Sequence, residues 1–137
     1  MYAVTVSDHF MIAHSFRGAL FGPAQALHGA TYEVEAEFRR PDLDLNNVVC
    51  DIGRAMTVLR EIAAAFDYRN LDDMPELKGI NTTTEFLAAE IHRRLAARTR
   101  AGDLGPDTAG RIASIKVTLR ESPRATASFE GPVADGP

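Results

Sequence analysis

The chain has 137 residues, of which 45% are hydrophobic, and this length and composition suit one globular domain with a substantial core. A formal net charge of −4 without any long basic run argues against binding to nucleic acid or to an anionic membrane. No apolar stretch is long enough to span a bilayer and no secretory signal begins the chain, so we expect a soluble cytoplasmic protein.

Two β-strands are predicted at the start of the chain. Apolar and polar side chains alternate from Met1 to Ser15 and again from Leu27 to Arg39, which is typical of strands with one buried face. We expect the first strand to reach about His14, with a loop over 15–26 before the second. Pro41 ends the second strand, because proline cannot donate to the hydrogen-bond ladder.

Two helices follow. Asp51 is placed to cap the first, whose apolar stripe comprises Ile52, Ala55, Met56, Leu59, Ile62, Ala63 and Phe66. After the polar, irregular stretch 67–81, Thr82 and Glu85 have the spacing of a capping box, so we expect Thr82 to begin the second helix.

The chain closes with two more strands. Alternation over 111–121 predicts one strand, and Ser122, Pro123 and Arg124 form a short turn to the last. The order ββααββ predicts an α+β fold, a four-stranded antiparallel sheet with two helices on one face. We expect a single domain over 1–130 and a disordered tail over 131–137. The open sheet edges favour pairing with other subunits.

Three polar residues share a face with apolar ones. His14, His28 and Glu121 each fall on the apolar side of a predicted strand, where a polar group needs a partner or a shifted pKa. Two histidines on adjacent strands can converge on a metal, but a catalytic zinc takes three protein ligands and the neighbouring position is Ala30. Residue types alone favour the alternative, a pair of core histidines.

Each of the other candidate site residues has two possible interpretations. Glu121 either anchors a planar ligand through two parallel N–H donors or pairs with an arginine. Asp67 and Tyr68 form either a proton relay or a helix exit beside a partly buried tyrosine, and residue types favour the exit. Thr83 and Thr84 either donate to a ligand or start a helix.

Cys50 is the only cysteine, which excludes an internal disulfide and a multi-cysteine metal site. Its place before the first helix would suit an activated thiol, although a small buried thiol is the commoner case.

Six segments, taken in order, resemble the 6-pyruvoyl-tetrahydropterin synthase family, which includes the 6-carboxy-tetrahydropterin synthases. They span the chain from about Tyr2 to Phe129. The segments are Phe10–His14, Leu27–Tyr32, Val49–Gly53, Phe66–Leu71, Thr83–Glu85 and Leu119–Glu121. No single motif is decisive, but six in the same order make chance unlikely to explain the resemblance.

The resemblance implies the tunnelling fold, with subunits joined edge to edge into a trimer, two trimers stacked as a hexamer, and sites between subunits. It also implies a pterin substrate and zinc as cofactor. His14 and His28 match two of the family's three zinc-binding histidines. Glu121 matches the glutamate that holds the pterin ring.

The resemblance further implies that Thr83 and Thr84 line the pterin pocket and that Asp67 belongs to the catalytic relay, beside Tyr68. Three positions depart from the family pattern. The third zinc histidine is Ala30, the catalytic cysteine is Ala24, and the relay histidine is Tyr68.

These departures remove a metal ligand and the usual acid and base. The sequence therefore predicts a divergent pterin-binding protein, a lyase-type enzyme acting on the side chain of a dihydroneopterin-like substrate, with reduced or absent synthase activity. Two alternatives stay open. One is a non-catalytic binder of a pterin or purine-like ligand, and the other is an aldolase-like enzyme on another carbonyl substrate.

Overall fold

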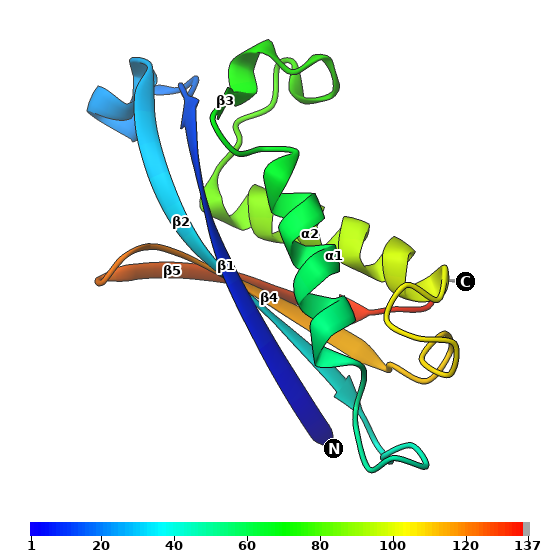
Figure 1. The fold of residues 1–137 in the computed structure, drawn as a ribbon. Coiled ribbons are helices and arrows are strands. Elements are labelled where there is room, and N and C mark those ends of the chain that lie inside the picture. The colour runs from blue at the N-terminus through cyan, green and yellow to red at the C-terminus, as the bar shows by residue number, and fades with distance from the viewer. Residues whose placement is uncertain (136–137) are drawn as a thin grey trace.

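One twisted sheet and two long helices make up the computed structural model, which describes residues 1–135 (Figure 1). In chain order the elements are β1 (Tyr2–His14), η1 (Ala19–Gln25), β2 (His28–Arg40), α1 (Ile52–Ala64), β3 (Arg69–Asn70), η2 (Leu71–Asp73), η3 (Pro75–Leu77), α2 (Thr84–Arg100), β4 (Ser114–Ser122) and β5 (Ala125–Pro132). The predicted ββααββ order is confirmed for the long strands and helices.

The sheet has five strands in the order β3-β1-β2-β4-β5. Four of them form the expected antiparallel series, in which β1 pairs with β2, β2 with β4, and β4 with β5. The prediction of four strands missed β3, which pairs in parallel with β1 at Ile12 and Ala13. Two residues are too few to show any alternation, so periodicity could not reveal this strand.

The pairing register puts the apolar side chains of neighbouring strands together. Phe10 lies opposite Tyr32, and Val34 opposite Leu119. Phe10, Tyr32, Val34 and Leu119 are all buried, at 1% exposure or less. At the end of the same ladder His14 lies opposite His28.

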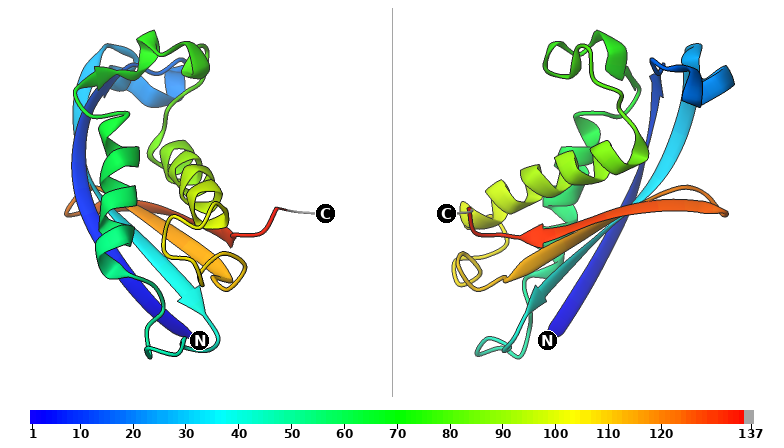
Figure 2. Two further views of the ribbon diagram at one scale, coloured as in Figure 1. Left: turned by 45° about the vertical axis from the view of Figure 1, so that its right-hand side comes forward. Right: turned by 180° about the vertical axis from the view of Figure 1, so that it is seen from behind.

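Both helices lie on the same face of the sheet, and their apolar stripes complete the core (Figures 1 and 2). α1 buries Leu59 and Ile62, and α2 buries Leu87, Ile91 and Leu95. Among the described residues, neither helix is long and apolar enough to cross a membrane. The helix-covered face therefore carries the inward side chains on which the candidate site depends.

The two helix starts differ in how well the sequence predicted them. The Asp51 side chain accepts a hydrogen bond from the Arg54 N–H, as expected for the cap of α1. The predicted cap of α2 at Thr82 is wrong, since Thr83 is the N-cap and accepts from the Phe86 N–H at 3.1 Å. Thr82 is buried and its hydroxyl has another partner, described below.

The C-terminal strand extends beyond residue 130. β5 runs to Pro132, and Val133 is buried at 2% exposure. The Val133 N–H donates to the Ala113 carbonyl at 3.2 Å, and its own carbonyl accepts from Arg100 at 2.6 Å. The predicted disordered tail over 131–137 therefore wrongly included residues 131–133, which belong to the folded domain. Residues 136–137 of this tail lie outside the described residues.

Replacing Val133 tests this extension. We expect Val133→Ala to lower the free energy of unfolding by about 1–2 kcal/mol, because a buried side chain loses methyl groups and leaves a cavity. Val48→Ala is the matched control, since Val48 is 40% exposed. Urea denaturation followed by circular dichroism measures both, and equal losses would contradict a packed Val133.

Candidate functional site

Two imidazole rings meet where β1 ends and β2 begins. The centroids of the His14 and His28 rings are 4.6 Å apart, with the rings edge to face. His14 is buried at 2% exposure and His28 is half-buried. The structure therefore brings together the two histidines that the sequence placed on one face.

Each ring has one nitrogen engaged. His28 Nδ1 lies 2.9 Å from the Ala26 carbonyl oxygen, which can only accept, so His28 Nδ1 is the donor. His14 Nδ1 lies 3.0 Å from the Thr82 hydroxyl. Burial, followed by the proximity of His28, lowers the pKa of His14 to about 4. His14 is therefore a neutral imidazole at neutral pH.

One aromatic ring from the loop after β1 packs against both histidines, and a second ring packs behind it. The Phe16 centroid is 4.5 Å from that of His14 and 5.4 Å from that of His28. Phe21, in η1, packs on Phe16 at 4.7 Å. Sequence analysis missed these two phenylalanines because they lie in a loop without any periodic pattern.

The histidine pair supplies too few donors for a catalytic zinc. Such a site takes three protein ligands, and residues 1–135 contain no group of three histidine, cysteine, aspartate or glutamate side chains arranged to hold a metal. Ala30, two residues beyond His28 on the same strand, offers no donor. The residues of this pair and its neighbours therefore do not fit a catalytic zinc.

Glu121 lies at the end of β4, beside the start of α2. Its nearest polar partner is Thr84, whose hydroxyl is 3.4 Å from Glu121 Oε2. The expectation of a buried Glu121 is wrong, because the residue is exposed. The ladder of β4 and β5 is irregular between Arg120 and Ser122, and such a bulge interrupts the alternation from which burial was predicted.

Tyr32 lies buried on the neighbouring strand, next to Glu121. It is 1% exposed, and its ring packs on Phe10 with centroids 5.5 Å apart. Burial raises the pKa of Tyr32, a hydrogen bond with the Thr84 hydroxyl opposes this, and the negative charges of Glu121 and Glu85 raise it further. Tyr32 therefore stays a protonated phenol at neutral pH.

Asp67 and Tyr68 are brought to the outer edge of β1. Asp67 Oδ1 accepts from the Met11 N–H at 2.9 Å, and the Tyr68 N–H donates to the Met11 carbonyl at 2.7 Å. The Tyr68 side chain is 82% exposed and its backbone has a positive φ of 58°. Among the described residues the two side chains form no hydrogen bond with each other, so the relay is not assembled within one chain.

The other candidate residues have structural partners. Thr83 caps α2, as described above, and Thr82 holds His14. Thr82 was missed as a site residue because three successive threonines give no sign of which one faces a histidine. Cys50 is buried at 2% exposure, and burial raises the pKa of its thiol to about 11, so it is not an activated nucleophile.

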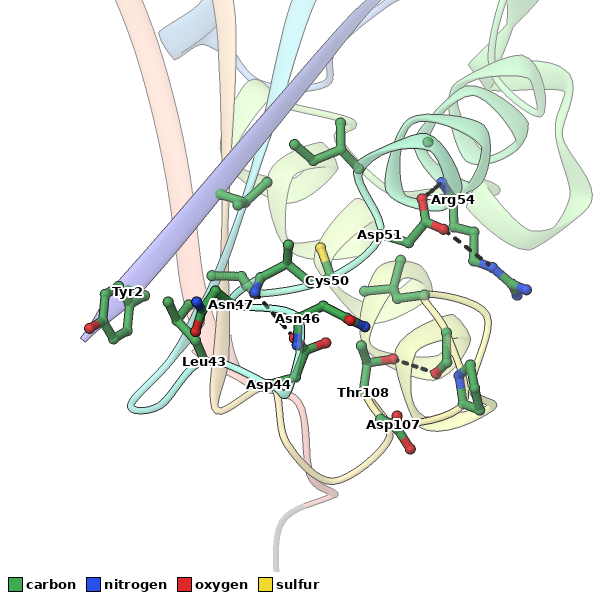
Figure 3. A pocket seen from close by; sticks show the side chains of 18 of the residues that line it. Tyr2, Leu43, Asp44, Asn46, Asn47, Cys50, Asp51, Arg54, Asp107 and Thr108 are labelled. Atoms are coloured by element: carbon green, nitrogen blue, oxygen red, sulfur yellow. Dashed lines mark hydrogen bonds and ion pairs between the residues drawn. The ribbon is translucent and has the colours of Figure 1, made fainter.

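Cys50 also lines a cavity of about 800 Å³ at the other end of the sheet, where β1 begins (Figure 3). Its polar groups are largely engaged with each other. Asp44 accepts from the Asn46 and Val48 N–H groups, and Asp51 accepts from Arg54. The histidine pair, Glu121 and their neighbours lie elsewhere, so the cavity is not the site that the sequence predicted.

Comparison with known proteins gives one family. The family model described as 6-pyruvoyl tetrahydropterin synthase matches residues 3–132. The 6-pyruvoyl tetrahydropterin synthase of Caenorhabditis elegans is similar in structure, with a TM-score of 0.75, 23% identity, and coverage of 96% of this chain and 97% of that chain. No curated protein sequence matches the chain.

The Plasmodium falciparum 6-pyruvoyl tetrahydropterin synthase gives a TM-score of 0.74 at 17% identity and covers 96% of this chain and 98% of that chain. The Plasmodium vivax enzyme gives 0.71 at 16% identity, with 96% and 99% covered. At these identities the likeness establishes the shared fold.

Two substitutions of Asp67 separate its backbone contact from its charge. We expect Asp67→Ala to lower the free energy of unfolding by roughly 1 kcal/mol, because the Met11 N–H loses its acceptor. Asp67→Asn keeps an oxygen acceptor and should cost less. Urea denaturation of both variants makes the comparison, and equal losses would show that the negative charge, not the acceptor, is what stabilises the chain.

Proposed function

The chain belongs to the 6-pyruvoyl tetrahydropterin synthase family, and on that premise we propose that it binds a reduced pterin through Glu121. The observation that carries the proposal is the exposed Glu121 carboxylate beside Thr84, above the buried Tyr32. A carboxylate accepts two parallel hydrogen bonds from the adjacent N–H donors of an amino-pyrimidinone edge.

The histidine pair lies beyond Tyr32 on β2, towards the start of that strand. Arg120 pairs with Glu33, which puts Glu121 next to Tyr32. His28 is four residues from Tyr32 along β2, roughly 13 Å at the usual strand rise. We propose that a ring held at Glu121 points its carbon-6 side chain along β2 towards His14 and His28.

We propose lyase-type chemistry on that side chain, with synthase activity reduced or absent. Among the described residues His28 Nε2 has no hydrogen-bond partner, so it is the proposed site of proton transfer, and His14 is a neutral imidazole beside it. Asp67 and Tyr68 remain candidates for proton transfer in an assembly, since they lie at a sheet edge. With Ala30 in place of a third ligand, zinc is expected to bind weakly.

The sheet edges support a homo-oligomer, a trimer or hexamer with sites between subunits. Among the described residues β5 pairs only with β4, so its other edge has no partner strand. The outer edge of β1 has no partner strand before Met11, whose backbone groups bond to Asp67 and Tyr68. β1 and β5 run in opposite directions, so β5 of one copy can extend the sheet at β1 of the next. The cytoplasm stays the predicted location.

A non-catalytic pterin binder is the second candidate. The observation in its favour is Tyr68, which replaces the expected relay histidine and extends into solvent with 82% exposure. In this case Glu121 and Thr84 keep their roles, while Asp67 serves only to hold Met11. The two candidates predict the same binding and differ in turnover.

Glu121→Gln tests the proposal. Glutamine offers one acceptor and one donor where two acceptors are needed, so we expect the Kd for 7,8-dihydroneopterin to rise at least about ten-fold. Glu33→Gln is the matched control, since Glu33 is 70% exposed on the opposite sheet face. Isothermal titration calorimetry measures binding, and chromatography of the pterin detects product.

The outcomes separate the two candidates. Product formed by the wild-type protein and lost in Glu121→Gln supports the lyase. Binding without product, unaffected by Asp67→Asn, supports the non-catalytic binder. No binding by the wild-type protein, or equal binding by Glu121→Gln, contradicts a pterin site at Glu121.

Ala30→His tests the metal donor count. The added imidazole gives a third ligand beside His14 and His28, so we expect zinc affinity to rise by more than about 100-fold, given that even an outer-shell partner is worth 10- to 100-fold. Metal analysis of untagged protein and zinc titration measure the change, with Ala30→His/His14→Ala as control. Tight stoichiometric zinc in the wild-type protein would contradict the expected weak binding.

A further inference from the structure

The cavity of about 800 Å³ lies where the start of β1 extends beyond the helices (Figures 1 and 3). Tyr2 has the same strand parity as the buried Phe10, so its side chain points to the helix-covered face of the sheet. α1 begins only at Ile52, and residues of the segments 43–51 and 104–108 line much of the remaining space. The cavity therefore occupies the part of this face that α1 and α2 leave uncovered.

Hydrogen bonds within the chain hold the two loops that line the cavity. Arg40 is 6% exposed, and its guanidinium donates to the carbonyl oxygens of Asp42 and Val49, one near each end of the first loop. In the second loop the hydroxyl of the buried Thr108 donates to the Gly105 carbonyl at 2.7 Å. The cavity is therefore preformed, as small-molecule sites usually are.

The size and the apolar lining of the cavity suit a small organic molecule. Val49 and Leu104 are buried in the lining at 3% exposure or less, whereas Tyr2, Val48 and Ile52 line it with 40–53% of their surface exposed. Large apolar side chains left exposed around one hollow are typical of a binding site. The volume also falls within the range of about 300–1,000 Å³ that such sites have.

The charges of the lining are negative. In the part of the chain that the structure describes, the lining contains three carboxylates, Asp44, Asp51 and Asp107, and one guanidinium, Arg54. Arg54 lies 3.8 Å from Asp51, while Asp44 and Asp107 form no ion pair with any residue of 1–135. Two negative charges therefore remain uncompensated, which attracts a cation to the cavity and repels an anion.

We propose that this cavity binds an organic cation with a flat apolar body and one protonated amine. The apolar body packs on Tyr2 and Ile52, and the ammonium group lies near Asp107, which Figure 3 shows on the other side of the cavity from Tyr2. This site is separate from Glu121 and the histidine pair, so the inference does not rest on the proposed function.

Two indole probes test the proposal. Tryptamine and indole-3-propionate share a ring and carry opposite charges, and the chain contains no tryptophan, so probe fluorescence is observed without protein indole. We expect fluorescence anisotropy to show saturable binding of one tryptamine per chain. Its Kd should be at least about ten-fold lower than that of indole-3-propionate, because attraction to the carboxylates becomes repulsion.

Asp107→Asn removes one of the two uncompensated charges. Asp107 is exposed and its side chain forms no hydrogen bond among the described residues, so we expect the variant to fold. The Kd for tryptamine should rise about three- to five-fold, the effect of one partly exposed charge pair, while indole-3-propionate should bind more tightly. Asp73→Asn is the matched control, since Asp73 is an exposed carboxylate in η2, beside the other end of β1.

Ile52→Ala tests the apolar contact. It shortens an exposed side chain of the lining, so we expect both probes to bind about two- to five-fold more weakly, whatever their charge. Circular dichroism shows whether each variant is folded.

The remaining outcomes contradict the proposal. Absence of saturable tryptamine binding at millimolar concentrations overturns it, and so does equal affinity for the two probes, which would show an apolar cavity without charge preference. An unchanged Kd for tryptamine in Asp107→Asn overturns the role of that carboxylate. Displacement of tryptamine by 7,8-dihydroneopterin would overturn the claim of a separate site, whereas failure of Glu121→Gln to weaken pterin binding contradicts only the proposed function.

Discussion

The antiparallel ladder between β1 and β2 is the constraint on which the rest of the structure depends. It runs without interruption from Tyr2 opposite Arg40 to His14 opposite His28. Because side chains alternate along a strand, a slip of one residue would move every inward side chain of β1 to the other face. The same register that buries Phe10 against Tyr32 therefore also brings the two imidazoles together.

Three successive threonines connect the β1–β2 ladder to the candidate site residues. Thr82 holds His14, Thr83 caps α2, and Thr84 reaches Glu121. Successive residues at the start of a helix point their side chains in different directions. Three threonines in a row therefore place three hydroxyls against three different partners. The start of α2 is thus the element that joins the histidine pair at one strand end to the carboxylate at another.

The proposed pterin-holding residues and the proposed proton-transfer residues differ in how they are arranged. Glu121 and Thr84 are joined by a hydrogen bond, whereas Ala30 and Tyr68 stand at the two positions where the family resemblance leads one to expect histidines. Parity along the strands predicted where His14 faces. The same alternation wrongly predicted that Glu121 is buried, because the irregular pairing at the end of β4 depends on the neighbouring strand.

The sequence by itself determined the order of the strands and helices, the apolar faces and the family, because periodicity and motifs are local properties of the chain. Tertiary structure decided which residues touch. The bond from Thr82 to His14 spans 68 positions and that from Asp67 to Met11 spans 56. Such contacts arise only when the sheet and helices pack, so no local pattern of residues could specify them.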